Sequence, residues 1–329
     1  LEDAAADAMV TATGDRWSYY MSAEEYKSYL DQVDNSYVGI GITIQLEEEE
    51  GYRILEVAST GPAAEAGLEA GDLLFEVEGQ DVREMDVTAV RDLVTGTPGT
   101  KVALRVLRKG EPRSFSVERR KVETPVATGE MLEKNVGLIT IENFDARCAE
   151  ESIAAIEALL DQGAKALIFD VRNNPGGYAD ELVKLLDYLL PEGDLFRTVR
   201  YDGKEHTDTS DKDFLDLPLA VLVNENSYSA AEFFAAALME YEAAVVVGEQ
   251  TCGKGYFQTT YKLPDGSAVG LSIGKYFTPK GVSLAGVGIT PDVMVPVDEE
   301  TFDAIYAGAL DPSEDPQIQA AVAALKKIQ

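Results

Sequence analysis

The chain is poor in histidine and in cysteine, and both shortages limit the chemistry that it can perform. Its 329 residues include one histidine, His206, and two cysteines. Cys148 and Cys252 lie far apart in the sequence with no second thiol near either, a spacing that excludes the usual zinc and redox motifs. We expect two free thiols, and one disulfide between them is the alternative.

Basic residues and long apolar runs are also scarce. The 28 Lys and Arg residues are outnumbered by 59 Asp and Glu residues, which gives a formal net charge of -31. Nucleic acid and anionic lipid are bound through Lys and Arg, so neither is an expected partner. No apolar run approaches the ~20 residues of a membrane-spanning helix. The chain begins at Leu1 without a signal sequence, and we expect it to be a trimmed fragment whose signal or anchor was removed.

The rest of the composition is that of a globular protein, with 45% hydrophobic and 26% charged residues. The pattern along the chain predicts a multidomain protein of the α/β and α+β classes. We expect residues 1–36 to be helical, residues 37–118 to be β-rich, and residues 119–329 to form an α/β domain with a C-terminal extension. The helical segment should pack on a neighbouring domain through Trp17, Tyr19, Tyr20, Tyr26 and Tyr29.

Residues 37–118 alternate short apolar runs with glycine-rich turns. Val38–Ile44 has an apolar residue at every second position, which is typical of a half-buried strand. Pro62 begins and Gly67 ends a short predicted helix, and a second helix is predicted over Asp86–Val94. A hairpin around Lys109–Pro112 closes the region.

This succession of elements resembles a PDZ domain. PDZ domains add an extended peptide to a sheet edge and hold its terminal carboxylate in a nest of backbone N–H groups. The resemblance implies that the carboxylate loop consists of Tyr37, Val38, Gly39, Ile40 and Gly41. Val90 and Leu93 on the second helix are candidate pocket residues, and burial in the core is the competing interpretation for both.

The last region alternates buried strands with helices. Ala166–Val171, Leu219–Val223 and Ala244–Gly248 are continuous apolar runs, typical of strands buried on both faces. Helices are predicted over three intervening segments, Ala149–Leu160, Asp180–Leu190 and Ala230–Tyr241. The alternation predicts a largely parallel sheet covered by helices.

Three loops that follow these strands carry candidate chemistry. The glycines of Asn174–Gly177 either present N–H groups to an oxyanion or only form a tight turn. Ser229 begins a helix and Glu232 completes a capping box, so Ser229 is an N-cap, a nucleophile or both. Lys254 lies between two glycines outside any P-loop pattern, as a base or as a surface lysine.

The histidine count favours lysine as the base of any serine nucleophile. His206 lies in a polar stretch that is predicted to be a solvated loop. Lys254 can act as a base only when it is uncharged, so its pKa has to be lowered by burial. If residues 254–258 are extended, Lys254 and Gln258 face the same side, and Gln258 could orient the amine.

Residues 224–258 resemble the signature of the carboxy-terminal processing peptidases, also called tail-specific proteases. The family pattern Asn-x-x-Ser-Ala-Ser-Ala-Ser-Glu begins at Asn224, with Tyr228 and Ala231 as departures, and Gly-Glu-x-Thr-x-Gly-Lys-Gly-x-x-Gln begins at Gly248. The resemblance implies a nucleophile, base and orienting amide at Ser229, Lys254 and Gln258, with oxyanion donation by the N–H groups of Gly176 and Ala230.

The same resemblance implies a crotonase-like or ClpP-like α/β catalytic core with an inserted PDZ domain. It further implies a serine endopeptidase of the bacterial cell envelope that docks free C-termini of proteins, gated by the PDZ domain, without metal or organic cofactor. A homodimer or higher oligomer could form through segments outside the chain. The alternatives are a tail-binding module with an inert catalytic domain and a non-proteolytic enzyme of crotonase-like fold. Possession of both Ser229 and Lys254 argues against the first, and the PDZ region argues against the second.

Overall fold

The computed structural model describes residues 2–47 and 50–326. The chain divides into two compact units. We call Ser36–Thr124 the inserted unit, and Leu1–Asn35 together with Pro125–Gln329 the core unit. The inserted unit extends to Thr124 because strand β9 (Arg120–Glu123) returns along strand β2 (Ser36–Gly39).

The core unit is organised around a six-stranded sheet in which every strand except the first runs parallel to its neighbour. The predicted burial on both faces is confirmed by alternate residues of one strand. Leu167 and Phe169 belong to the core on one face, whereas Ala166 and Ile168 belong to the core on the other. In order across the sheet the strands are β10 (Ala127–Met131), β11 (Val136–Ile141), β12 (Ala166–Asp170), β15 (Leu219–Val223), β16 (Ala244–Gly248) and β19 (Val293–Met294).

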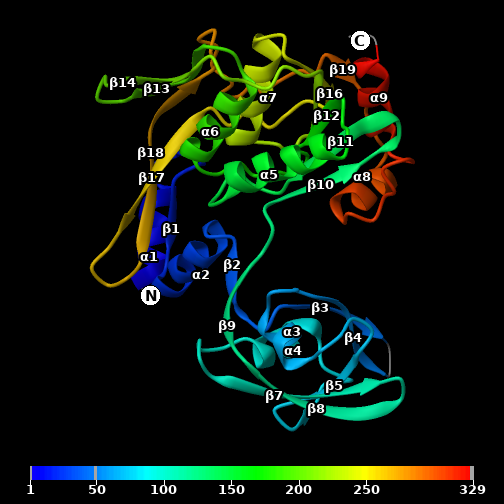
Figure 1. Cartoon of the computed structure of the whole chain (residues 1–329). Coiled ribbons are helices and arrows are strands. Elements are labelled where there is room, and N and C mark those ends of the chain that lie inside the picture. The colour runs from blue at the N-terminus through cyan, green and yellow to red at the C-terminus, as the bar shows by residue number, and fades with distance from the viewer. Residues whose placement is uncertain (1, 48–49, 327–329) are drawn as a thin grey trace. The chain divides into compact units, whose positions relative to one another are not determined.

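Helices cover both faces of this sheet (Figure 1). The three helices predicted between the strands are confirmed to within one residue at each end. One face carries α5 (Cys148–Asp161), α6 (Ala179–Leu189) and α7 (Ala230–Glu240), and α9 (Pro316–Leu325) packs on the other, preceded by α8 (Glu299–Tyr306). Within the described ranges, no helix combines the length and apolarity that a membrane crossing requires.

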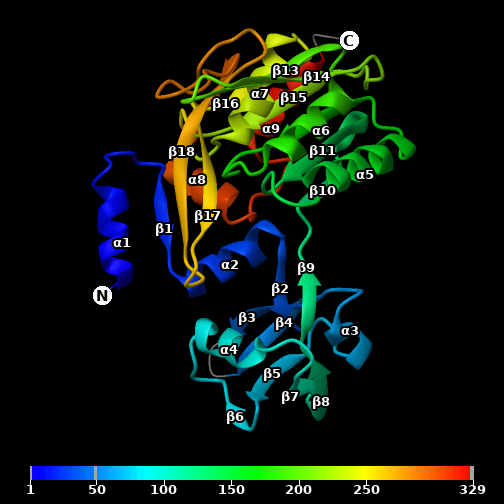
Figure 2. The ribbon, with the colours of Figure 1, turned by 90° about the vertical axis from the view of Figure 1, so that its left-hand side faces the viewer.

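A second, antiparallel sheet of the core unit includes part of the N-terminal segment. The prediction of helix throughout residues 1–36 is wrong for β1 (Tyr19–Met21), which pairs with β18 (Ala268–Phe277), as Figure 2 shows. This long-range pairing outweighs local propensity, and Gly270 leaves room for the Tyr19 ring that lies over it. The remaining elements are α1 (Glu2–Thr11), α2 (Ala23–Val33), β13 (Gly193–Arg200), β14 (Glu205–Ser210) and β17 (Tyr256–Lys262).

The inserted unit is an antiparallel sheet with two short helices around its own apolar core. Tyr52, Leu74 and Val90 are fully buried in this core. The strand order is β3-β4-β5-β7-β8, and β6 pairs with β5. The elements are β3 (Ile42–Glu47), β4 (Gly51–Val57), α3 (Pro62–Ala66), β5 (Leu73–Val77), β6 (Gln80–Asp81), α4 (Val87–Val94), β7 (Lys101–Arg108) and β8 (Glu111–Glu118).

The backbone of Gly248, the last residue of β16, leaves no room for a side chain. Its φ is +131°, and a Cβ there would lie 2.0 Å from the carbonyl oxygen of Val223 on the adjacent strand. We predict that Gly248→Ala lowers the free energy of unfolding by about 2–4 kcal/mol. Gly203→Ala is the control, because Gly203 has a φ of +83° but open space around it. Urea denaturation measures both, and equal losses would contradict the steric argument.

Candidate active site

A cavity of about 580 Å³ in the core unit brings the candidate catalytic residues together. Ser229 lines it from the start of α7, Lys254 from the loop between β16 and β17, and Gln258 from β17 itself. Gly176 lines it from the loop that follows β12, and residues of β1 and α2 form the opposite wall. The N-terminal segment therefore contributes directly to the site.

Ser229 occupies a constrained turn between β15 and α7. Its φ of 59° and ψ of -124° lie in a region that non-glycine residues rarely adopt, and its residue exposure is 8%. The turn before it is held by Ser227, whose hydroxyl donates to the carbonyl of Val171 at 2.7 Å. Ser229 occupies the N-cap position of α7 as predicted, and the turn presents it to the cavity.

The fully buried carboxylate of Glu232 links the nucleophile to the loop of the candidate base. It accepts hydrogen bonds from the N–H of Ser229 at 3.0 Å and from the hydroxyl of Thr251 at 2.6 Å. It also accepts from the N–H groups of Gly253 at 2.7 Å and Lys254 at 2.8 Å. The sequence showed Glu232 only as a capping residue, because its other three donors come from a distant loop.

Lys254 is largely enclosed by aromatic rings. Burial lowers the pKa of its amine, and this effect exceeds the opposing influence of Cys252 and Glu232. The Nζ atom lies 5.0 Å from the ring centroid of Trp17 and 5.7 Å from that of Tyr228. It donates no hydrogen bond to any described residue, Ser229 and Gln258 included. Ser229 and Lys254 thus share one cavity, and the Lys254 amine lies over the rings of Trp17 and Tyr228.

Gln258 lies in the cavity, but not for the reason that the sequence suggested. The extended segment begins only at Tyr256, and the register with β18 shifts between Phe257 and Gln258. The same-face argument for residues 254–258 is therefore wrong. The Gln258 amide donates to Ser272 Oγ at 3.1 Å and to the carbonyl of Tyr256 at 3.3 Å.

The predicted oxyanion donors differ in their availability. Ala230 is the first residue of α7, so its N–H has no acceptor within the helix. The N–H of Gly176, in contrast, is donated to Asn174 Oδ1 at 2.8 Å, which corrects its assignment as a donor. Across residues 2–47 and 50–326, no group accepts from the N–H of Gly177, the next residue. Gly176 still has to be glycine, because a Cβ there would lie 2.7 Å from that of Ser229.

The other candidate residues, His206 and the two cysteines, do not line this cavity. His206 is part of β14, not of a loop, and its exposed ring contacts Asp208 at 3.0 Å. Cys148 is buried and Cys252 exposed, and both are free thiols, so the disulfide alternative is excluded. In the described part of the chain, no group of His, Cys, Asp and Glu side chains could hold a metal ion.

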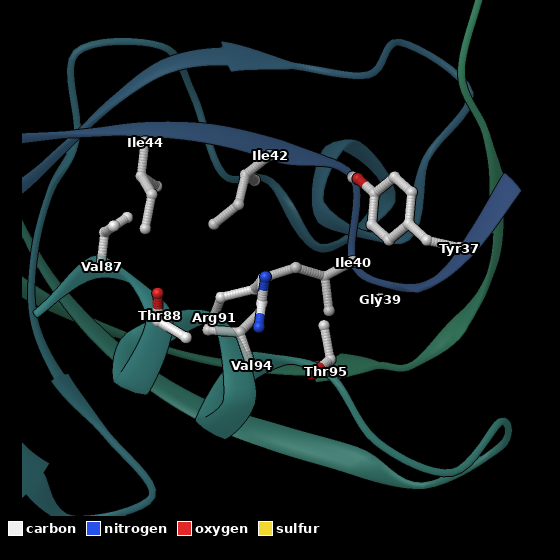
Figure 3. A pocket seen from close by; sticks show the side chains of 11 residues that line it. Tyr37, Gly39, Ile40, Ile42, Ile44, Val87, Thr88, Arg91, Val94 and Thr95 are labelled. Atoms are coloured by element: carbon white, nitrogen blue, oxygen red, sulfur yellow. The ribbon is translucent and has the colours of Figure 1, made fainter. Parts of the chain in front are cut away.

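The inserted unit carries a separate groove of about 300 Å³ between β3 and α4 (Figure 3). Tyr37, Gly39, Ile40 and Gly41 of the predicted loop line this groove, whereas Val38 does not. Ile42 and Ile44 continue the wall along β3. From the helix side it is lined by Val87, Thr88, Arg91, Val94 and Thr95.

The prediction that Val90 and Leu93 line the groove is wrong. Val90 is fully buried in the core and Leu93 packs against the same core, so the competing interpretation holds for both. Val87, Arg91 and Val94 recur at spacings of four and three residues, which places them on one face of α4. This spacing, visible in the sequence, could have identified the face of α4 that lines the groove.

Comparison with known proteins finds one family match in each of the two units. The model of peptidase family S41 matches residues 135–295, and a PDZ domain model matches residues 53–108. Residues 135–295 form a peptidase family S41 domain. A probable CtpA-like serine protease of Staphylococcus epidermidis (strain ATCC 12228 / FDA PCI 1200) is 34% identical over 299 residues, covering 90% of this chain and 60% of the relative.

Two further relatives extend the comparison. The carboxy-terminal processing protease CtpA of Bacillus subtilis (strain 168) is 34% identical over 297 residues, 89% of this chain and 63% of the relative. The chain thus spans about 60% of the length of these curated relatives. The structure of a photosystem II D1 C-terminal processing protease aligns with a TM-score of 0.55 and 26% identity, over 96% of this chain and 87% of that one.

The four hydrogen bonds of Glu232 predict a large effect on stability. Glu232→Ala leaves four donors without their acceptor, and we expect the free energy of unfolding to fall by about 3 kcal/mol or more. Amide hydrogen exchange at Gly253 and Lys254 should accelerate in parallel. Glu240→Ala is the matched control, since Glu240 lies on the same helix and, among the described residues, accepts from two donors, Thr278 and Lys280. Similar losses in the two variants would show that the Glu232 contacts are not specially stabilising.

Proposed function

We propose that this chain is the catalytic and tail-binding part of a serine endopeptidase that processes proteins from their C-termini. The observation that carries the proposal is the cavity shared by Ser229 and a buried lysine of lowered pKa. One carboxylate, that of Glu232, binds the backbone of both residues. The family S41 domain and the names of the CtpA relatives support the same reaction class.

In this mechanism the neutral amine of Lys254 leaves the rings of Trp17 and Tyr228 and accepts the proton of the Ser229 hydroxyl. Ser229 Oγ attacks the peptide carbonyl, and the N–H groups of Ala230 and Gly177 stabilise the oxyanion. The Lys254 ammonium then protonates the leaving amine. A water molecule deprotonated by Lys254 attacks the acyl carbonyl, and the Lys254 ammonium returns the proton to Ser229 Oγ as it leaves. Gln258 helps to orient the amine during transfer.

The groove of the inserted unit would hold the substrate tail. Its carboxylate would bind N–H groups of the loop at Gly39–Gly41, as PDZ domains bind a terminal carboxylate. Ile40, Ile42 and Val94 would surround an apolar last side chain. Protein substrates with free C-termini are therefore the proposed partners, and the PDZ domain would both dock the tail and gate cleavage.

Three further features belong to the same proposal. We expect the core unit to share its architecture with crotonase-like or ClpP-like enzymes, and the protein to act in the bacterial cell envelope. Oligomerisation would involve segments beyond the chain. Deletion of residues 37–118 tests the gating, because unchanged processing of tailed substrates would count against it.

Cleavage of an unstructured protein tests the reaction directly. Wild type should cleave it, whereas Ser229→Ala and Lys254→Ala should each lose at least about a thousandfold in kcat/KM. Equal cleavage by all three proteins would refute the mechanism. Tail binding without cleavage by wild type would favour the binding module.

The lowered pKa of Lys254 predicts the direction of the pH dependence. Because the neutral amine is the base, kcat/KM should rise with pH as Lys254 deprotonates. The midpoint of this rise should lie below the ordinary lysine pKa of 10.5, since burial lowers the pKa of Lys254. Lys254→Arg stays protonated and should be inactive throughout the range. A pH profile that is flat, or whose midpoint lies at 10.5 or above, would contradict the role of Lys254.

The hydrogen bond between Tyr37 and the backbone of Gly41 predicts a measurable effect on tail binding. Burial raises the pKa of its phenol, opposed by a hydrogen bond from the Gly41 backbone, and its hydroxyl lies over the loop in Figure 3. A tail carboxylate would use the same N–H. In a Ser229→Ala background, Tyr37→Phe should therefore tighten binding of a tail peptide about two- to tenfold. The amidated peptide is the control and should bind neither protein. Unchanged or weaker binding of the free acid would contradict competition by Tyr37.

A further inference from the structure

Two charged side chains line the catalytic cavity, and the mechanism uses only one of them. Besides Lys254, the cavity is lined by the carboxylate of Asp145, which follows β11 and precedes α5. Asp145 is the single acidic residue among the described residues that line this space. The net negative surface of the chain does not explain it, because this carboxylate is half-buried beside the nucleophile's cavity.

The backbone around Asp145 is fixed against the glycine loop. Phe144 donates its N–H to the carbonyl of Gly176 at 2.7 Å and accepts from the N–H of Tyr178 at 2.8 Å. The N–H of Asp145 itself is donated to Asn143 Oδ1 at 2.9 Å. Contacts on both sides therefore hold the residue next to the loop that would border a reacting carbonyl.

The Asp145 carboxylate itself has no partner in the described part of the chain, since none of those groups donates a hydrogen bond to it. Among the described residues, the groups whose pKa responds to Asp145 include Tyr29 of α2, Tyr178 before α6 and Cys148 of α5, none of which becomes a cation. Lys254 lines the same cavity but donates no hydrogen bond to this carboxylate. Burial raises the pKa of Asp145 to about 7. Burial without a partner disfavours the charged form of a carboxylate. A cation that entered the cavity would therefore offset the desolvation free energy of the Asp145 carboxylate.

We propose that Asp145 is a specificity-determining residue that binds a Lys or Arg side chain of the substrate near the scissile bond. This inference rests on the proposed peptidase function. A cationic side chain would make a charge-assisted hydrogen bond to the carboxylate. Tyr29 and Tyr178 line the same cavity, and an aromatic ring attracts a cation that lies over its face. An apolar side chain would gain neither contact and would leave the carboxylate unpaired.

Matched peptides test the inference. Each pair carries Lys or norleucine at one position, scanned over the residues on either side of the cleaved bond. For at least one position, the ratio of kcat/KM for the Lys peptide over the norleucine peptide should exceed ten in wild type. Asp145→Asn should reduce that ratio by about tenfold to a hundredfold. Asp180→Asn is the control, because Asp180 is exposed on α6 outside the cavity and should leave the ratio unchanged.

The pH dependence of the same ratio gives a second readout. The carboxylate form attracts the cation, so the wild-type preference for Lys should strengthen as the pH rises through about 7. Asp145→Asn should lose this dependence. Asp145→Glu keeps the charge and should retain part of the preference.

The outcomes separate this inference from the proposed function. If wild type cleaves norleucine peptides but shows no Lys preference at any position, the role of Asp145 is wrong and the peptidase function stands. An equal loss on both peptides in Asp145→Asn leaves the ratio unchanged and also overturns the inference. If wild type cleaves no peptide while its tail binding is intact, the proposed function itself fails.

Discussion

One buried carboxylate, which accepts four hydrogen bonds, joins the two loops of the core unit that carry Ser229 and Lys254. Glu232 receives its hydrogen bonds from the nucleophile's own backbone and from three groups of the loop that carries the lysine. The two loops can meet because β15 and β16 are adjacent parallel strands, so their carboxyl ends lie at the same edge of the sheet. A carboxylate with no exposure is stable only where such donors saturate it. The helix and the loop therefore hold each other.

A second set of contacts ties the loop after β12 to this arrangement. Asn224 accepts from the N–H of Asn173 at 2.9 Å, and its amide donates to the Asn173 side chain at 2.8 Å. Asn174 is fully buried and donates to the carbonyl of Ile141 at 2.7 Å. Three consecutive parallel strands thus deliver three loops that are cross-linked by side chains. The amine of Lys254 makes no hydrogen bond to the described residues, so none of these would have to break for it to approach Ser229.

The sequence predicted the features that depend on local pattern. Continuous apolar runs located the buried strands, and the loops after them carried Ser229, Lys254 and Gly176. Features that depend on specific tertiary contacts were not predicted from the sequence. The strand at Tyr19 forms because β18 offers an edge, and the N–H of Gly176 is taken by a side chain two residues earlier. Val90 was ambiguous because the core face and the groove face of α4 are adjacent, and both are apolar.

The central claim is that Ser229 is a nucleophile whose reactivity depends on Lys254. Covalent labelling with a serine-reactive fluorophosphonate, located by peptide mass spectrometry, tests it without any assumption about the natural substrate. We expect a single adduct on Ser229, formed faster as the pH rises and lost in Lys254→Ala. An adduct on another serine, or equal labelling rates for wild type and Lys254→Ala, would contradict it.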